Sequence, residues 1–360
     1  MVRSVNIYLR CVALFALFLS GGELASGAAP VPTKQSFAEE VQERLESLGL
    51  DEQDYQKIIQ YVSGNEFQND PESSIDWNEG EDFASLGMGH FIWYPEGVEQ
   101  KFTESFPKMA VVLWRSWPTS SDIPPQLRSA FNYSKEFIFK SSGEVRFCPW
   151  AKRTSFFAWK EQNPIEWGYL ISFINHPMIK RIQLAYMDQD FREAIVRLYD
   201  EVDSNDDLVA MEASSGETVA SVRQHLRSVI LSLLTSKEGT TALMDYVNFK
   251  GDGTDSRMRY SNVGWGLQQV LYWTDLKSGS LEQLKSLARA ALNRLTRRAM
   301  LSGREIEREV WIHGWANRVL GYGYLDSDSY IQNMKRERKP DGKLSWPKLH
   351  IGDRALRQLF

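Results

Sequence analysis

Three residues combine side-chain types and spacings that could carry acid–base chemistry: Glu66, Glu79 and Ser85. Glu66 follows Val62 by four positions, so it extends the apolar stripe of a predicted helix. A carboxylate that points inward at a helix end is costly to bury in its ionised form, and its pKa is therefore expected to rise. A raised pKa is what a general acid needs near neutral pH. The pattern thus predicts that Glu66 is a proton donor.

The second carboxylate, Glu79, and the hydroxyl of Ser85 belong to a predicted β-hairpin that follows this helix. An acid at a helix end that faces a carboxylate on a hairpin is the arrangement that cleaves glycosidic bonds. One group protonates the leaving oxygen, and the other supports a water molecule or the positively charged sugar ring. Carboxyl groups about 6.5–9.5 Å apart would favour inversion, and groups about 5–5.5 Å apart would favour retention.

The elements that must position these side chains are mainly helical. Residues 36–48 and 51–62 form two short amphipathic segments, the second with Asp51 as a plausible N-cap and with Gly64 and Asn65 as its stop signal. Residues 74–93 contain close glycines among bulky apolar side chains, which favours a small twisted hairpin over a helix.

Further helices follow along the chain. Residues 95–165 are rich in aromatic residues and prolines, which predicts short helices joined by ordered loops. Apolar residues at helical spacing predict longer helices over 177–200, 216–235, 280–300 and 304–320, and Ser280 with Gln283 predicts a capping box for the third. The expected fold class is α+β, mostly α, with one small β-hairpin.

The stretch from Glu66 to His90 resembles the active-site hairpin of the phage-type lysozymes, within the lysozyme-like superfamily. In that pattern a Glu closes a helix and is followed by an Asp, a Thr and an Ile-Gly-x-Gly-His run. Here the run is Leu86-Gly87-Met88-Gly89-His90, Glu79 stands for the Asp and Ser85 for the Thr. The spacing between the two acids is longer by four residues, and the likeness covers about forty residues, over 55–93.

The resemblance implies a lysozyme-like helical fold with the hairpin beside an active-site cleft. Glu66 would be the general acid, Glu79 the base that orients water, and Ser85 a residue that holds that water. A gap-free alignment would instead place Asp70 at the position of the acid, but Asp70-Pro71 reads as a turn.

The resemblance also gives readings for the rest of the hairpin. Gly87 and Gly89 would have structural roles in the backbone of the turn, and His90 would connect the hairpin to a nearby helix. Trp93 and Tyr94 would either line a sugar cleft, because aromatic faces stack on pyranose rings, or belong to the core.

A second cluster, over residues 246–269, is dense in glycine, amide and aromatic side chains on an apparent loop before a helix. We interpret it as the opposite wall of the substrate groove, with Asn248, Tyr260 and Trp265 as candidate binding residues. The alternative is an ordered structural loop.

Composition excludes several other classes of function. The 42 Lys and Arg against 47 Asp and Glu give a formal net charge of −5, which argues against a broad nucleic-acid surface. Cys148 next to a histidine could make a nucleophilic pair, but a lone cysteine is more often a small core residue. Residues 203–207 begin like a calcium loop and lack its glycine and closing glutamate, so we read a solvated turn. No motif for a metal or other cofactor is found.

The first 28 residues read as a secretory signal peptide, because a short apolar run from Cys11 to Leu19 precedes small residues at 26–28. About ten apolar residues are too few for a membrane anchor. We therefore expect a secreted or periplasmic protein with no membrane span after cleavage. Residues 29–150 would form an N-terminal lobe with the active-site helix and hairpin, 151–330 a helical lobe, and 331–360 a polar C-terminal tail.

These observations predict an exported hydrolase of a β-1,4-linked amino-sugar polymer, most simply peptidoglycan. A non-catalytic glycan-binding or envelope-associated protein is the main alternative, and a chitosanase-like enzyme is a third. Glu66 and Glu79 facing one another across an open groove would favour catalysis. Carboxylates that point apart, or that are capped by Arg or Lys, would favour binding alone.

Overall fold

The computed structural model describes residues 36–67, 70–204, 218–255 and 263–324, together with two short strands over 337–338 and 344–345. These residues are mostly helical, with one small three-stranded antiparallel sheet, so the predicted α+β, mainly α class is confirmed. The predicted leader, Tyr260 and most of the C-terminal tail lie outside the described residues.

Two helices open the described chain. α2 (Phe37–Leu48) begins with a capping box between Ser36 and Glu39. α3 (Glu52–Phe67) begins at Asp51, whose carboxylate accepts hydrogen bonds from the next residues' backbone, as predicted for an N-cap. The predicted stop at Gly64 and Asn65 is wrong, because both residues are buried within α3 and Asn65 donates to Asp245 on another helix. Tertiary packing thus offsets the unfavourable helix propensity of glycine.

The sheet lies directly after α3. Its strands are β1 (Ile75–Asp76), β2 (Ala84–Leu86) and β3 (Phe91–Trp93), paired in that order. Ser85 lies opposite Asp76 on one side and opposite Ile92 on the other. All of β2 is buried, so the sheet is covered on both faces.

Short helices occupy the region that the aromatic residues mark. They are α4 (Phe106–Arg115), α5 (Arg128–Ile138), α6 (Arg153–Gln162) and α7 (Pro164–Ile174). Their aromatic rings pack edge to face, as Trp150 does on Phe156 and Phe131 on Phe173. Cys148 is buried among them, and burial raises the pKa of its thiol to about 12, as befits a core residue.

A long helix, α8 (Pro177–Asp200), connects this region to a second group of helices. The group comprises α10 (Val219–Leu233), α11 (Lys237–Lys250), α12 (Leu267–Tyr272), α13 (Ser280–Leu301), a π-helical turn (Glu307–Trp311) and α14 (Ile312–Leu320). Single 3₁₀ turns cover Pro71–Ser73, Pro125–Leu127, Glu201–Ser204 and Gly321–Tyr324, and the strands β4 (Glu337–Arg338) and β5 (Leu344–Ser345) pair with each other.

Two expectations for this second group need correction. Gln283 does not complete a capping box with Ser280: it is fully buried, accepts from the Lys277 backbone and donates to the Asp275 carbonyl, while Gly279 is the N-cap. The apparent loop at 246–250 is the last part of helix α11.

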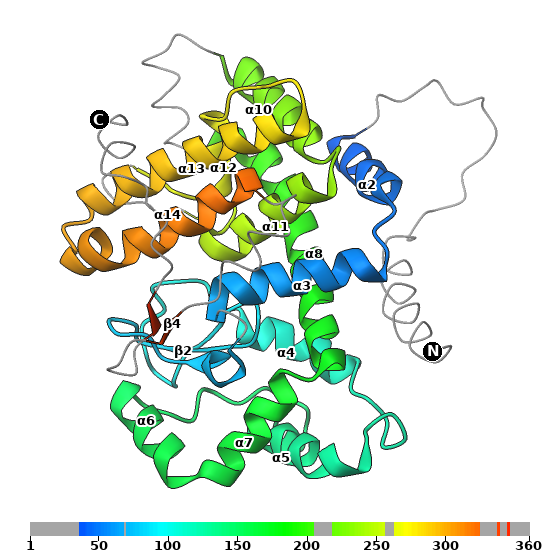
Figure 1. Cartoon of the computed structure of the whole chain (residues 1–360), viewed down its shortest axis with the longest axis vertical. Coiled ribbons are helices and arrows are strands. Elements are labelled where there is room, and N and C mark those ends of the chain that lie inside the picture. The colour runs from blue at the N-terminus through cyan, green and yellow to red at the C-terminus, as the bar shows by residue number, and fades with distance from the viewer. Residues whose placement is uncertain are drawn as a thin grey trace.

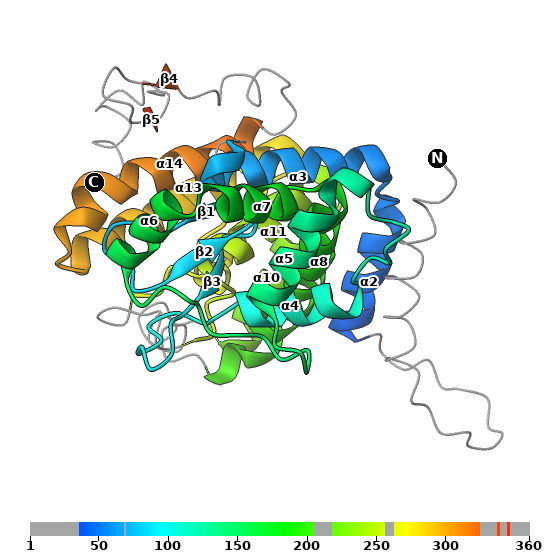
Figure 2. The ribbon, with the colours of Figure 1, turned by 90° about the horizontal axis from the view of Figure 1, so that it is seen from below.

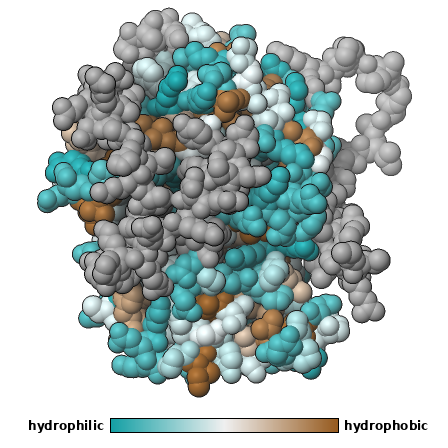
Figure 3. Space-filling view, viewed as in Figure 1, coloured by the Kyte–Doolittle hydropathy of each residue, from teal (hydrophilic) through white to brown (hydrophobic). Residues whose placement is uncertain are grey.

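The arrangement places α3 between the two helical groups. Figure 1 shows α10–α14 on one side of α3, α5–α7 on the other, and α8 running past both, with β2 near the C-terminal end of α3. The turned view shows the sheet beneath α3 and α7 (Figure 2). The described part of the face in Figure 3 is mainly hydrophilic, with isolated apolar residues. Among the described helices, none is both long and apolar enough to cross a membrane.

Candidate active site

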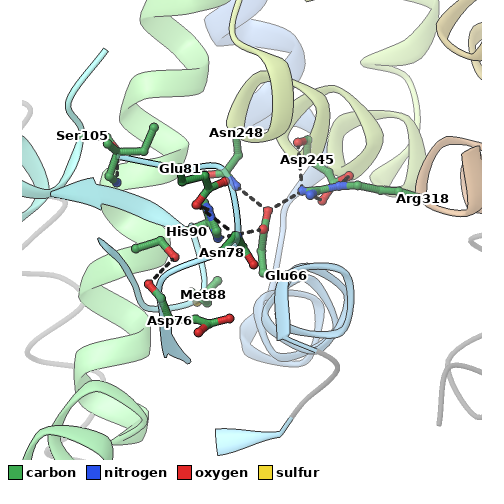
Figure 4. Close-up of polar contacts among 12 residues, drawn as sticks. Glu66, Asp76, Asn78, Glu81, Met88, His90, Ser105, Asp245, Asn248 and Arg318 are labelled. Carbon is green, nitrogen blue, oxygen red and sulfur yellow. Dashed lines mark hydrogen bonds and ion pairs between the residues drawn. The ribbon is translucent and has the colours of Figure 1, made fainter. Parts of the chain in front are cut away.

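Glu66 lies in the last turn of α3 and points toward the second helical group (Figure 4). Its Oε1 accepts a hydrogen bond from the Asn248 side chain at 3.1 Å and lies 2.7 Å from Nη2 of Arg318. Its Oε2 lies 3.8 Å from Nδ1 of His90. Only 10% of the side chain is exposed, so Glu66 is a nearly buried carboxylate with an adjacent cation.

Arg318 is the centre of a buried ion network. Its guanidinium binds both carboxylate oxygens of Asp245 in α11, at 2.9 and 2.8 Å, and the Tyr322 hydroxyl donates to Asp245 at 2.9 Å. Burial alone would lower the pKa of Arg318, but Asp245 and Glu66 raise it well above its usual range. Arg318 therefore stays charged and shares that charge between two carboxylates.

Glu81 approaches the same place from the hairpin. It ends a tight turn that begins at Asn78, whose amide donates to its carboxylate at 3.2 Å, and the turn rests on Trp77 through an indole hydrogen bond to the Glu81 carbonyl. Only 15% of the Glu81 side chain is exposed. Burial raises the pKa of this carboxyl group above its ordinary value, and the charge of His90 and the Asn78 hydrogen bond offset the rise only in part.

His90 lies between the two glutamates. Its Nδ1 is 3.8 Å from Glu66, and its Nε2 is 4.0 Å from Glu81. Its backbone has a φ of 48°, a left-handed conformation in which non-glycine residues are uncommon. Such conformations persist where the surrounding structure imposes them, and they concentrate at functional sites.

The turn from Gly87 to His90 is fixed by a buried glutamine of α8. Gln183 accepts a hydrogen bond from the Met88 backbone at 2.8 Å and donates to the Ile174 carbonyl at 3.0 Å. Gly87 has a φ of +76°, and a Cβ there would lie 2.3 Å from the Gln183 amide oxygen. A Cβ on Gly89 would lie 2.4 Å from the Phe91 ring. Both glycines are thus required by close approach.

A cavity of about 890 Å³ opens beside the two glutamates. Aromatic side chains contribute to its lining, among them Phe83, Tyr94, Trp265, Trp311 and Trp315. Acidic and basic groups are interspersed along it: Glu81, Asp82, Lys101, Lys108, Asp190 and Arg197 near the hairpin and α8, and Lys250, Asp252, Arg298, Glu307 and Arg318 near α11, α13 and α14. Its volume lies in the range of small-molecule sites, and it combines apolar rings with a few polar groups, as such sites commonly do.

Two of the predicted catalytic residues do not line this cavity. Glu79 is exposed on the outer side of the turn, because Gly80 has a φ of +83° and the chain reverses there. Glu81, two residues on, lines the cavity. Ser85 is buried in the middle strand of the sheet, where its hydroxyl donates to the Asp76 carbonyl at 3.4 Å. The predicted role of Ser85, to hold a water molecule in the cavity, is therefore not compatible with its position.

The predicted binding residues also divide. Asn248, Tyr94 and Trp265 belong to the cavity lining, although Tyr94 (1% exposed) and Trp265 (4% exposed) are buried behind its surface. Trp93 does not: it is fully buried, packs on Phe106 and donates its indole hydrogen to a backbone carbonyl, so it is a core residue. Tyr260 lies outside the described residues.

Asp70, the alternative acid, caps the 3₁₀ turn Pro71–Ser73 by accepting from the Glu72 backbone, and it is not among the residues that line the cavity. This role agrees with the turn that Asp70-Pro71 predicts. Glu66 is thus the residue of this pair that reaches the cavity.

Three site residues escaped the sequence analysis: Glu81, Asp245 and Arg318. A signal for two of them existed, because Asp245 interrupts the apolar run 242–247 and Arg318 falls at helical spacing between Trp315 and Tyr322. Charged residues at such positions must find a partner when they are buried. Among the described residues, no group of three or more His, Cys, Asp or Glu side chains is arranged to hold a metal ion.

Comparison with known proteins identified no related protein. No family model matches the chain, and neither a characterised protein nor a solved structure matches it significantly.

Proposed function

We propose that the protein is an exported glycoside hydrolase that cleaves a β-1,4-linked amino-sugar polymer, most simply peptidoglycan, with a lysozyme-like site. The observation that carries the proposal is a pair of carboxyl groups in unlike surroundings, Glu66 and Glu81, placed on either side of His90 at a cavity lined by aromatic rings. Most glycoside hydrolases use two carboxyl groups in different roles, one as the acid and one as the base or nucleophile.

The roles follow from the surroundings of each group. Burial raises the pKa of Glu81, so Glu81 holds the proton that is donated to the glycosidic oxygen. Glu66 receives hydrogen bonds from Asn248 and the positive charge of Arg318, so it acts as the carboxylate that supports a water molecule or the developing positive charge on the sugar ring. The proton donor proposed from sequence, Glu66, thereby takes the second role.

Aromatic rings of the cavity fit a sugar polymer. Trp311 and Trp315 are partly exposed there. Tyr94 is only 1% exposed and its hydroxyl accepts from the Phe102 backbone, so it supports the cavity wall from behind. Exposed indole faces stack on the apolar faces of pyranose rings, while the charged groups between them orient the polar substituents.

The test compares three glutamine variants on purified cell-wall peptidoglycan and on chitosan. Glu81→Gln and Glu66→Gln should each lower turnover about a hundred- to ten-thousand-fold, because each removes one half of the carboxyl pair. Glu79→Gln is the matched control, since it removes an exposed carboxylate from the same turn and should keep wild-type turnover. Wild-type turnover in Glu66→Gln and Glu81→Gln would refute the assignment of Glu66 and Glu81 as the catalytic pair. Loss of turnover in Glu79→Gln would support the sequence-based pair, Glu66 and Glu79.

One observation favours the second candidate, a non-catalytic glycan-binding protein. Arg318 caps Glu66 at 2.7 Å, and a capped carboxylate is what binding alone predicts. This candidate requires that the wild-type protein binds glycan strands in a pull-down with insoluble peptidoglycan and releases no soluble fragments. Release of fragments that depends on Glu81 rules it out.

A further inference from the structure

One lysine at the cavity stands out by its surroundings. Lys250 is the last residue of α11, and only 9% of it is exposed, yet it belongs to the cavity lining. Its ammonium nitrogen lies 4.2 Å from the ring centre of Phe249, 4.1 Å from that of Trp265 and 3.8 Å from that of Trp315. Three aromatic rings therefore hold this amine at the edge of the cavity.

Two arginines share these rings with Lys250. The guanidinium of Arg298 lies 4.5 Å from the Trp265 ring, and that of Arg318 lies 4.3 Å from the Phe249 ring. Both arginines line the same cavity. We name Lys250, Arg298 and Arg318 the cationic wall.

The carboxylates of this region are engaged by the arginines. Glu307 bonds Arg298 and Arg304, and Asp245 and Glu66 bond Arg318. Among the described residues, no carboxylate lies within ion-pair distance of the Lys250 amine. The nearby charges are the repelling Arg318 and Arg298 and the more distant, attracting Glu307 and Glu66. An anion in the cavity would be the missing partner.

This inference rests on the proposed function: we propose that the cationic wall binds a carboxylate carried by the glycan. The substrate class is thereby narrowed to acidic amino-sugar polymers, as opposed to neutral chitin or cationic chitosan. A charged hydrogen bond to a buried ammonium adds affinity for such a chain. The rings around Lys250 stabilise the protonated form without neutralising it.

When the carboxylate binds, Lys250 should also take up a proton, and this uptake should depend on pH. Burial, followed by Arg318 and Arg298, lowers the pKa of Lys250 to about 7. In the empty cavity at pH 8 the amine is therefore mostly neutral, and a bound carboxylate raises its pKa by favouring the charged form. Binding at pH 8 then consumes close to one proton, whereas binding at pH 6 consumes little, because the amine is already charged.

The test is calorimetric titration at pH 8 and pH 6 in two buffers of different ionisation enthalpy, with the full-length Glu81→Gln chain to slow cleavage. The parent ligand is a tetrasaccharide of alternating N-acetylglucosamine and N-acetylmuramic acid, which carries lactyl carboxylates. In a second ligand these lactyl groups are amidated, and in a third they carry peptide stems. Neutral chitotetraose is the fourth ligand and has no carboxylate. At least one carboxylate-bearing ligand should bind about tenfold or more tightly than chitotetraose and take up protons at pH 8. The amidated and peptide-bearing forms tell whether the sugar or the peptide carries the recognised carboxylate.

The matched variants are Lys250→Met and Lys135→Met. Lys135 also lies over two indoles, Trp114 and Trp117, but on α5 and away from the cavity lining. Lys250→Met should abolish both the acidic preference and the proton uptake, and Lys135→Met should keep them. A preference or proton uptake that survives Lys250→Met overturns the proposal, as does equal affinity for all four ligands.

The tests of the cationic wall and of the hydrolase activity have separate readouts. Mass spectrometry of the ligands after incubation with the wild-type chain reports cleavage, and titration reports binding. Cleavage of all ligands with no acidic preference refutes the cationic wall and leaves the hydrolase. Acidic preference without cleavage refutes the hydrolase and leaves the cationic wall.

Discussion

The hairpin side and the helical side of the cavity treat the same residue type in opposite ways. On the hairpin side, Glu81 is desolvated and receives one amide hydrogen bond, so its pKa rises. On the helical side, Glu66 is buried to a similar degree but lies against Arg318 and Asn248. Burial therefore does not by itself make a proton donor. The two glutamates thus differ in their partners: a buried guanidinium and an amide hold Glu66, whereas desolvation dominates at Glu81.

Removal of the cation from the helical side should have the largest effect on stability. Arg318→Met leaves Asp245 fully buried without its bidentate partner and leaves Glu66 without its cation. We expect a loss of about 3–5 kcal/mol in the free energy of unfolding, measured by urea denaturation. Arg181→Met, which breaks the surface pair with Glu52, should cost at most about 1 kcal/mol. Similar losses in both variants would contradict the assignment of Arg318 to a buried ion network.

A smaller loss is expected on the hairpin side from Gly87→Ala. The new methyl group would need the left-handed backbone of Gly87 and would lie 2.3 Å from Gln183, which anchors the turn. We expect a destabilisation of about 1–3 kcal/mol by the same measurement.

Gly97→Ala isolates the packing part of this cost. Gly97 has nearly the same φ, +77°, but no atom lies within 4 Å of the added methyl group. Gly97→Ala should therefore cost only the backbone part, about 1 kcal/mol. Equal losses in the two variants would show that Gln183 does not hold the hairpin in place.

The pH dependence of stability gives the smallest and most specific effect. Because the folded-state pKa of Glu81 is raised, the folded protein binds the proton more tightly than the unfolded chain does. This contribution is fully present below about pH 4.3, the ordinary value for glutamate, and is lost as pH rises through the folded-state pKa. Stability of Glu81→Gln relative to wild type should therefore increase with pH over that range, in urea melts at successive pH values.

Glu79→Gln is the control for this series, because it removes a neighbouring exposed carboxylate from the same turn. A pH-dependent difference that both variants share would arise from the charge of the turn as a whole. In that case the distinction between Glu81 and Glu66 would lose its support.

Local patterns alone determined much of the helical framework. α8 runs from Pro177 to Asp200, as the apolar spacing predicts, and Asp51 caps α3. The β-structure over 74–93 also follows from residues only a few positions apart, although the sequence predicted a hairpin and the structure has three strands. The end of α3 does not, because packing overrides the local stop signal at Gly64 and Asn65. Periodicity and capping depend on neighbours within one or two turns, so the sequence displays them directly.

The charge environment of the site was decided only by the tertiary structure. Asn248 reaches Glu66 across 182 positions, and Arg318 reaches Asp245 across 73. The three rings around Lys250 likewise come from α11, from the segment before α12 and from α14. Which glutamate of the turn faces the cavity depended on the backbone reversal at Gly80. Electrostatic partners are chosen by proximity in space, and no local periodicity encodes that proximity.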